Sequence, residues 1–182
     1  MEKKVQIQNV VSTAKLGTNI NLSDLARNAI NIEYKPSKFI AAILRIRNPR
    51  TTCLCFSTGK LVIVGAKSIE ESKKAARKFA RRIQRALKST SIQFHNFTIR
   101  NIVASFTNKY KIDLCSLYYA NMSKCTYAQE DFPGLKYKPF VDEKVVSIIF
   151  NSGCVIITGA TKISKIEEVS NLMYRILLKF RK

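Results

Sequence analysis

The segment FSTGKLVIVGA at residues 56–66 returns as FNSGCVIITGA at residues 150–160, without a gap and 94 positions later. Five of the eleven aligned residues are identical. A second pair, QNVVS at 8–12 and RNIVA at 100–104, lies 92 positions apart. Two copies with a period near 93 do not make a solenoid, which needs at least three stacked units of roughly 20 to 50 residues. We therefore expect one pseudo-twofold molecule.

The repeat divides the chain into a short lead at 1–4, a first repeat at 5–92 and a second repeat at 93–182. In both repeats the periodicity predicts a strand, a short helix, several strands and a long helix. For the first repeat these elements are Val5–Val10, Leu22–Ile32 capped by Asn21 or Ser23, 39–46, 51–56, 61–64, and a helix from Ser68 to about Leu87. For the second they are 97–103, 114–122, 135–141, 145–150, 154–158 and a closing helix.

Both long helices have a capping-box sequence at their start, Ser68–Glu71 in the first repeat and Ser164–Glu167 in the second. Each helix also has one apolar stripe, which indicates packing of one face on a sheet. The expected fold is α+β: two pseudo-symmetric repeats form one curved antiparallel sheet, a saddle, with helices on the convex face.

Charge points to the kind of partner. The chain has 32 Lys and Arg against 12 Asp and Glu, a net charge of +20, with 19 basic and five acidic residues among the first 92. Such an excess favours salt-sensitive binding of phosphates, so nucleic acid is the expected partner. A merely basic surface and an anionic membrane are weaker interpretations, and no apolar run approaches a membrane span of about 18 residues.

Few residues suit a metal site or catalysis. The five cysteines are scattered, without the spacing of metal ligands, and His95 is the only histidine. Gly59-Lys60 lacks the upstream glycines of a phosphate loop, and no paired carboxylates converge by spacing. We expect no enzyme activity, no metal and no cofactor. The opening residues also do not predict a signal peptide, so we expect an intracellular protein.

The strands have apolar residues at both odd and even positions, so both faces of the sheet would be apolar. This is unusual for a sheet covered by helices on one face only. From Lys60 onward, Leu61 and Ile63 point one way while Val62 and Val64 point the other. A large exposed apolar face indicates that something flat and partly apolar docks there. The protein without nucleic acid could also form a weak homodimer through this face.

Five segments occur in order across the two repeats: QNVVST at 8–13, RIRNPRTT at 45–52, GAKS at 65–68, FPGL at 132–135 and GA at 159–160. Together they resemble the conserved core of the TATA-box-binding protein family. The resemblance covers about Val5 to Arg181 and implies a nuclear protein that initiates transcription by bending promoter DNA. It also implies that paired wedges enter the minor groove, namely Phe39, Phe56, Phe132 and Phe150.

The resemblance implies further DNA contacts. Asn9 and Asn101 would donate to minor-groove acceptors at the centre of the site, where A·T pairs present only acceptors. Apolar contacts with base edges and sugars would come from Val11, Ile40, Leu54, Val62, Val103, Pro133, Ile148 and Ile156, and further base contacts from Val64 and Thr158. Phosphates would be held by Arg45, Arg50, Lys60, Lys138 and Lys144. Without the resemblance, most of these residues would be taken for ordinary strand packing.

Three departures from the family pattern affect these expectations. Val64 stands where the family usually has Thr, which the second repeat keeps as Thr158, so we expect one hydrogen bond fewer and lower stringency for TATA sequences. Cys154 replaces a lysine, which removes one phosphate contact. One extra residue lies between Phe132 and Phe150, within 139–144, and would displace that loop.

The resemblance also implies protein partners. A factor like TFIIB would dock on Glu130, whose acidic neighbour in the family is here Ala128. Factors like TFIIA, and other regulators, would meet the basic long helix of the first repeat through Lys73, Arg77 and Arg81. A solvated helix face is the alternative interpretation of that run of cations.

Two alternative functions remain open from the sequence. One is a related or architectural DNA-bending protein with weak TATA preference, which Val64 favours. The other is a scaffold that binds only proteins and would show no salt-dependent DNA binding.

Overall fold

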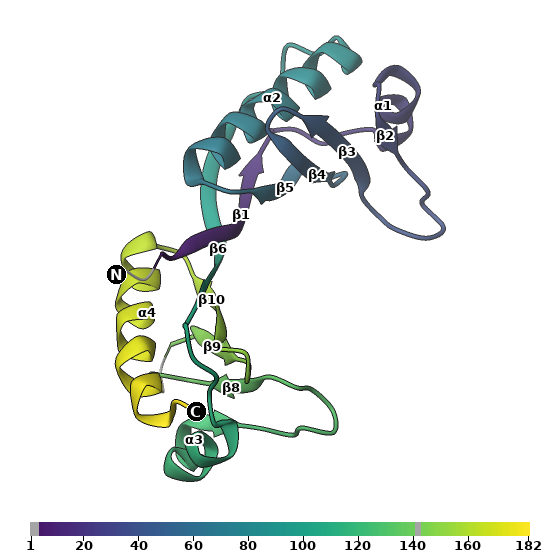
Figure 1. The fold of residues 1–182 in the computed structure, drawn as a ribbon. Coiled ribbons are helices and arrows are strands. Elements are labelled where there is room, and N and C mark those ends of the chain that lie inside the picture. Colours follow the sequence, from purple (N-terminus) through teal and green to yellow (C-terminus); the bar gives the residue numbers. More distant parts are fainter. Residues whose placement is uncertain (1–3, 141–142) are drawn as a thin grey trace. The chain divides into compact units, whose positions relative to one another are not determined.

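The computed structural model describes residues 4–140 and 143–182. These residues form two compact units (Figure 1). The first unit comprises residues 9–100, and the second unit comprises the residues up to 8 together with those from 101 onward. The predicted repeat boundary between 92 and 93 stays a prediction, and residues 1–3 of the predicted lead lie outside the described residues.

The first unit is built on five strands, a short helix and a long helix. The elements are β1 (Gln6–Lys15), α1 (Leu22–Asn28), β2 (Ile32–Glu33), β3 (Ala42–Arg47), β4 (Arg50–Cys55), β5 (Lys60–Ala66) and α2 (Ile69–Leu87). Hydrogen-bonded neighbours follow the order β2-β3-β4-β5-β1, and all of these pairs are antiparallel.

The second unit repeats this plan. Its elements are β6 (His95–Thr107), α3 (Leu114–Ala120), the 3-10 turn η1 (Met122–Lys124), β7 (Cys125–Thr126), β8 (Leu135–Tyr137), β9 (Val146–Ile149), β10 (Cys154–Ala160), α4 (Ile163–Leu177) and η2 (Leu178–Phe180). The strand order is β6-β10-β9-β8-β7. These neighbouring strands are also antiparallel. The predicted antiparallel α+β fold is confirmed.

In the first unit, one face of the sheet is covered by α2 (Figure 1). The apolar stripe of α2, centred on Phe79 and Ile83, is fully buried against Leu61 and Ile63 of β5. Burying a side chain of this size stabilises the fold by about 1.5 to 3 kcal/mol. Val62 lies on the other face and is only half-buried. The alternation therefore leaves an apolar face that no helix of this unit covers.

Two predicted elements of the first unit end earlier or start later than expected. The helix predicted over Leu22–Ile32 stops at Asn28, because Asn31 adopts a left-handed φ of 58° and Ile32 then pairs with Leu44 in a strand. The strand predicted from residue 39 starts only at Ala42. Phe39 and Ile40 precede it in a loop, where the Phe39 amide donates to the carbonyl of Lys35.

One predicted capping box is confirmed and the other is wrong. Ser68 caps α2, since its Oγ accepts from the amide of Glu71 at 3.0 Å, and the Glu71 carboxylate accepts from the amide of Lys67. In the second unit, α4 starts before Ser164, with Lys162 at the N-cap and no side-chain cap. Lys162 lies 94 residues after Ser68, so the register of the repeat, rather than the local Ser-x-x-Glu pattern, locates this helix start.

The remaining boundaries differ by a few residues. Asn21, one of the two cap candidates, caps α1 by accepting from the amides of Ser23 and Asp24. The strand predicted over 135–141 is formed by Leu135–Tyr137, and its last predicted residue, Val141, lies outside the described residues. The short strands β2 and β7 were not predicted, because two residues are too few for a periodic pattern.

The uncapped start of α4 generates a stability prediction. Replacing Lys162 with Ser should supply an acceptor for the amide of Lys165 and remove a cation from the positive end of the helix. We expect Lys162→Ser to raise the free energy of unfolding by about 1 kcal/mol, measured by urea denaturation. Lys162→Ala is the control, because it removes the charge without adding a cap. A serine variant no more stable than the alanine variant would contradict the capping argument.

Candidate nucleic-acid interface

A bulge in β5 fixes the orientation of Asn9 on the uncovered face of the first unit. The β1–β5 register shifts between Val10 and Ser12, and Gly65 at the bulge has a φ of 97°, a conformation that disfavours side chains. Its amide N–H is thereby freed from the ladder and donates to Oδ1 of Asn9 at 2.7 Å. Because a backbone N–H can only donate, this bond directs the Asn9 amide nitrogen, with its two donors, away from the glycine.

The second unit repeats this arrangement around Asn101. The amide of Gly159, whose φ is 94°, donates to Asn101 Oδ1 at 2.8 Å. Here the amide nitrogen also has a partner, since Asn101 Nδ2 donates to Thr158 Oγ1 at 3.1 Å. In the first unit Val64 occupies the position of Thr158, and the described residues offer Asn9 Nδ2 no acceptor. The two asparagines therefore have the same orientation, but only the amide nitrogen of Asn101 is held by a hydrogen bond.

Half-buried apolar side chains share the uncovered face of each unit with its asparagine. In the first unit they are Val11, Leu54, Val62 and Val64, and in the second unit Val103, Ile148 and Ile156. Their strand neighbours Leu61, Ile63, Ile149 and Val155 point to the helix face and are fully buried. The structure thus places six of the eight predicted apolar contacts on the uncovered faces, while Ile40 and Pro133 lie in the loops before β3 and β8.

Each unit also carries two of the predicted wedge residues. Phe56 and Phe150 start equivalent hairpin turns: the amide of Phe56 donates to the carbonyl of Lys60, and that of Phe150 to the carbonyl of Cys154. Phe39 is 41% exposed and Phe132 is 38% exposed, beside the exposed Ile40 and Pro133. Exposed apolar side chains that adjoin one another, as Phe39 and Ile40 do, are more informative than single ones, because contiguous apolar patches mark binding sites.

In the second unit the two wedge rings touch. Phe132 and Phe150 meet edge to face, with centroids 5.9 Å apart. Gly134 makes this possible, because a Cβ there would lie 2.6 Å from Phe132 Cε1 and 3.1 Å from Phe150 Cε1. The aligned residue in the first unit is Ala41. The sequence showed the FPGL segment but gave no signal that its glycine makes room for the rings.

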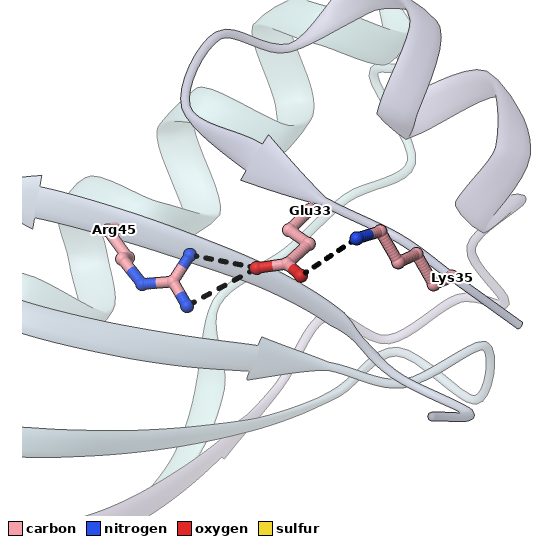
Figure 2. Close-up of polar contacts among 3 residues, drawn as sticks. All are labelled: Glu33, Lys35 and Arg45. Carbon is pink, nitrogen blue, oxygen red and sulfur yellow. Dashed lines mark hydrogen bonds and ion pairs between the residues drawn. The ribbon is translucent and has the colours of Figure 1, made fainter. Parts of the chain in front are cut away.

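The predicted phosphate contacts Arg45, Arg50, Lys60, Lys138 and Lys144 are all exposed. The backbone carbonyls of Arg50 and Lys144 lie against Gly65 and Gly159 respectively, so the backbone of a predicted phosphate contact packs on the bulge glycine in each unit. Arg45 is already paired: both of its terminal nitrogens lie 3.4 Å from Glu33 Oε2, and Lys35 approaches the same carboxylate at 3.8 Å (Figure 2).

The pairing of Arg45 was not predicted, because nothing in the sequence places residue 33 beside residue 45 before the β2–β3 register is known. Exposed ion pairs contribute only about 0 to 1 kcal/mol, so a phosphate can replace Glu33 as the partner of Arg45. Glu33 would therefore compete with a phosphate for Arg45 without preventing the phosphate from binding.

The predicted partner-binding residues lie on exposed surfaces away from the asparagines. Glu130 belongs to an exposed segment just before Phe132, and Lys73, Arg77 and Arg81 are exposed on α2. Arg77 and Arg81 border a hollow of about 200 Å³ together with Ile92 and Phe94.

The described residues contain no group of three or more histidine, cysteine or acidic side chains that could hold a metal ion. Within the same residues, no helix is long and apolar enough to span a membrane. Burial raises the pKa of the Cys55 thiol to about 12 and that of Cys125 to about 11, so both stay protonated at neutral pH. Cys55 is a core residue, and Cys125 is half-buried.

Comparison with known proteins identifies the family. The family model described as "Transcription factor TFIID (or TATA-binding protein, TBP)" matches twice, at residues 4–86 and 96–180. The chain belongs to the TATA-binding protein family. Among the solved structures, Methanococcus jannaschii TBP superposes with a TM-score of 0.80 at 32% identity, covering 97% of this chain and 99% of that one.

Full-length relatives of this TATA-binding protein family member differ in size. The rat "TATA box-binding protein-like 2" is 49% identical over 177 residues, which is 97% of this chain but 51% of the rat protein. The TATA-box-binding protein of Acetabularia peniculus is 42% identical and is covered to 91%. The chain thus spans about half the length of the first of these relatives.

The asparagine geometry predicts the effect of Val64→Thr. A threonine at 64 should give Asn9 Nδ2 the acceptor that Thr158 gives Asn101, and so hold the amide ready to donate. A neutral hydrogen bond contributes about 0.5 to 1.5 kcal/mol, so affinity for a TATA-containing duplex should rise roughly two- to tenfold, measured by fluorescence anisotropy. Thr158→Val is the matched control and should lower affinity. An unchanged or weaker affinity of Val64→Thr would refute the argument.

The ring contact in the second unit predicts a second effect. Gly134→Ala should push Phe132 and Phe150 apart, because the new Cβ would meet both rings and Ile148. We expect a smaller bend in a TATA-containing duplex labelled at both ends with a fluorescent donor and acceptor. Ala41→Gly, at the aligned position of the first unit, should leave the bend unchanged. An unaltered bend in Gly134→Ala would show that the wedge needs no such close packing.

Proposed function

We propose that this chain is a general transcription initiation factor that binds the minor groove of TATA-type promoter DNA. In this proposal it kinks the duplex with its paired phenylalanines and nucleates assembly of the initiation complex in the nucleus. The observation that carries the proposal is the pair of asparagines, each held by a glycine amide so that its Nδ2 donors are directed away from the bulge.

The chemistry of the minor groove supports this assignment. A·T pairs present only acceptors there, whereas a G·C pair adds a donor that would oppose the asparagine amide. The half-buried apolar side chains around each asparagine suit sugars and base edges. Insertion of apolar wedges between base steps is the mode of minor-groove architectural proteins, this family among them, and the wider contact offsets the few kcal/mol of unstacking.

The exposed cations support a role in positioning. Phosphate contacts fix register and orientation but carry no sequence information directly. We assign this role to Arg45, Arg50, Lys60, Lys138 and Lys144. Net charge of +20 further implies affinity that falls steeply with salt.

We propose that protein partners use the remaining exposed residues. Glu130 would contribute to docking of a factor like TFIIB, and Lys73, Arg77 and Arg81 of α2 to docking of a factor like TFIIA or of acidic regulators. A weak homodimer through the apolar face, in the absence of DNA, belongs to the same proposal.

A second function is favoured by Val64: an architectural, TBP-related protein that bends DNA with weak TATA preference. The described residues give the amide nitrogen of Asn9 no threonine partner, so sequence discrimination in this half would be lower. The two functions share the fold and the wedges and differ in specificity.

The deciding experiment titrates two doubly labelled duplexes, one with a TATA element and one with that element replaced by G·C pairs. We expect much tighter binding and a clear bend only for the TATA duplex. Equal affinity would establish the architectural alternative, and absence of salt-dependent binding to either duplex would refute both.

The same duplex tests the wedges. Phe56→Ala and Phe150→Ala should each remove most of the bend, because an alanine cannot hold a base step open. Tyr119→Ala removes an aromatic ring that is 73% exposed outside the interface and is the matched control. Energy transfer that stays unchanged in the phenylalanine variants would overturn the wedge assignment.

A further inference from the structure

The first unit contains a hollow of about 690 Å³ between the end of β3 and the solvent side of α2. Six cationic side chains border it: Arg45 and Arg47 from β3, and Lys78, Arg81, Arg82 and Arg85 from α2. No carboxylate borders it, and Ile46 is its one apolar side chain. The hollow has the size of a small-molecule site but the lining of an anion site.

Most of this charge has no partner in the protein. Arg45 is paired with Glu33, and Lys78 Nζ donates to the carbonyl of Asn48 at 2.7 Å. Across residues 4–140 and 143–182, the guanidinium groups of Arg47, Arg81, Arg82 and Arg85 meet no protein acceptor. Like charges three and four residues apart on a helix repel one another, so this arrangement destabilises α2 in the absence of an anion.

The second unit shows that the fold does not need all of these cations. Arg81 and Arg85 align with Arg175 and Lys179, 94 positions later, but Lys78 and Arg82 align with Leu172 and Ile176, which are half-buried on α4. The second repeat therefore builds the same helix with half of this charge. A structural role does not explain why the first unit concentrates it.

The chemistry of the lining defines the ligand. A guanidinium presents several N–H donors in a planar fork that matches phosphate oxygens two at a time. An extended acidic peptide spaces its charges along about 3.3 Å of chain per residue, whereas linked phosphates put several charges into one compact volume. A hollow bordered by six cationic residues fits the second case. We propose that this hollow binds a compact polyphosphate anion.

The test is isothermal titration of the intact chain with inorganic tripolyphosphate at physiological salt. We expect saturable one-to-one binding that the double variant Arg82→Gln/Arg85→Gln weakens by about tenfold or more, since each lost charge-assisted hydrogen bond is among the stronger ones. The control Lys15→Gln/Lys74→Gln removes the same charge from exposed positions outside the hollow and should change the affinity less than about twofold.

Three results would overturn the proposal. Equal weakening in both double variants would show general attraction to a basic protein rather than a site. A hexaglutamate peptide that binds as tightly as tripolyphosphate and responds equally to Arg82→Gln/Arg85→Gln would assign the hollow to an acidic protein segment. A TATA-containing duplex that loses affinity by the same factor in that variant would assign the arginines to DNA. Thermal unfolding of each variant confirms that it is folded, and none of these outcomes depends on the proposed promoter function.

Discussion

The hydrogen bond from a bulge glycine to an asparagine Oδ1 sets the arrangement of each uncovered face. It forms only because Gly65 and Gly159 adopt left-handed backbone angles that take their amides out of the strand ladder. The bond fixes which end of the asparagine amide is presented, and the carbonyls of Arg50 and Lys144 pack on the same two glycines. One backbone irregularity thus sets both the orientation of the asparagine amide and the packing of the neighbouring strand residue, Arg50 or Lys144.

The two faces of the sheet have different roles, because alternate residues along each strand point to opposite faces. Leu61 and Ile63 are buried beneath α2 and stabilise the unit, while Val62 and Val64 remain half-buried on the face without helices. Because the residues on the helix-covered face already form the core, the residues on the other face are free to serve binding. The cations of α2 lie on the solvent side of the helix, so charge on that side varies between the repeats without affecting the core.

The repeat in the sequence predicted the fold. The family resemblance predicted the contact residues. The predicted element boundaries were correct where a cap or a period was strong, as at Ser68. They failed where a short strand overrode helix periodicity at Ile32, and where a local Ser-x-x-Glu pattern conflicted with the register of the repeat at Lys162. Contacts such as Arg45 with Glu33 or Asn101 with Thr158 depend on strand register, which periodicity alone does not specify.

The difference between Val64 and Thr158 has a directional consequence. A protein with two identical halves would bind a nearly palindromic sequence equally well in either orientation, and transcription would have no preferred direction from that contact. Here one asparagine keeps both amide donors free, while the other shares one with a threonine. If the chain binds DNA as proposed, with each half on its own half-site, the two orientations would differ in free energy, and a single methyl-for-hydroxyl exchange would contribute to that difference.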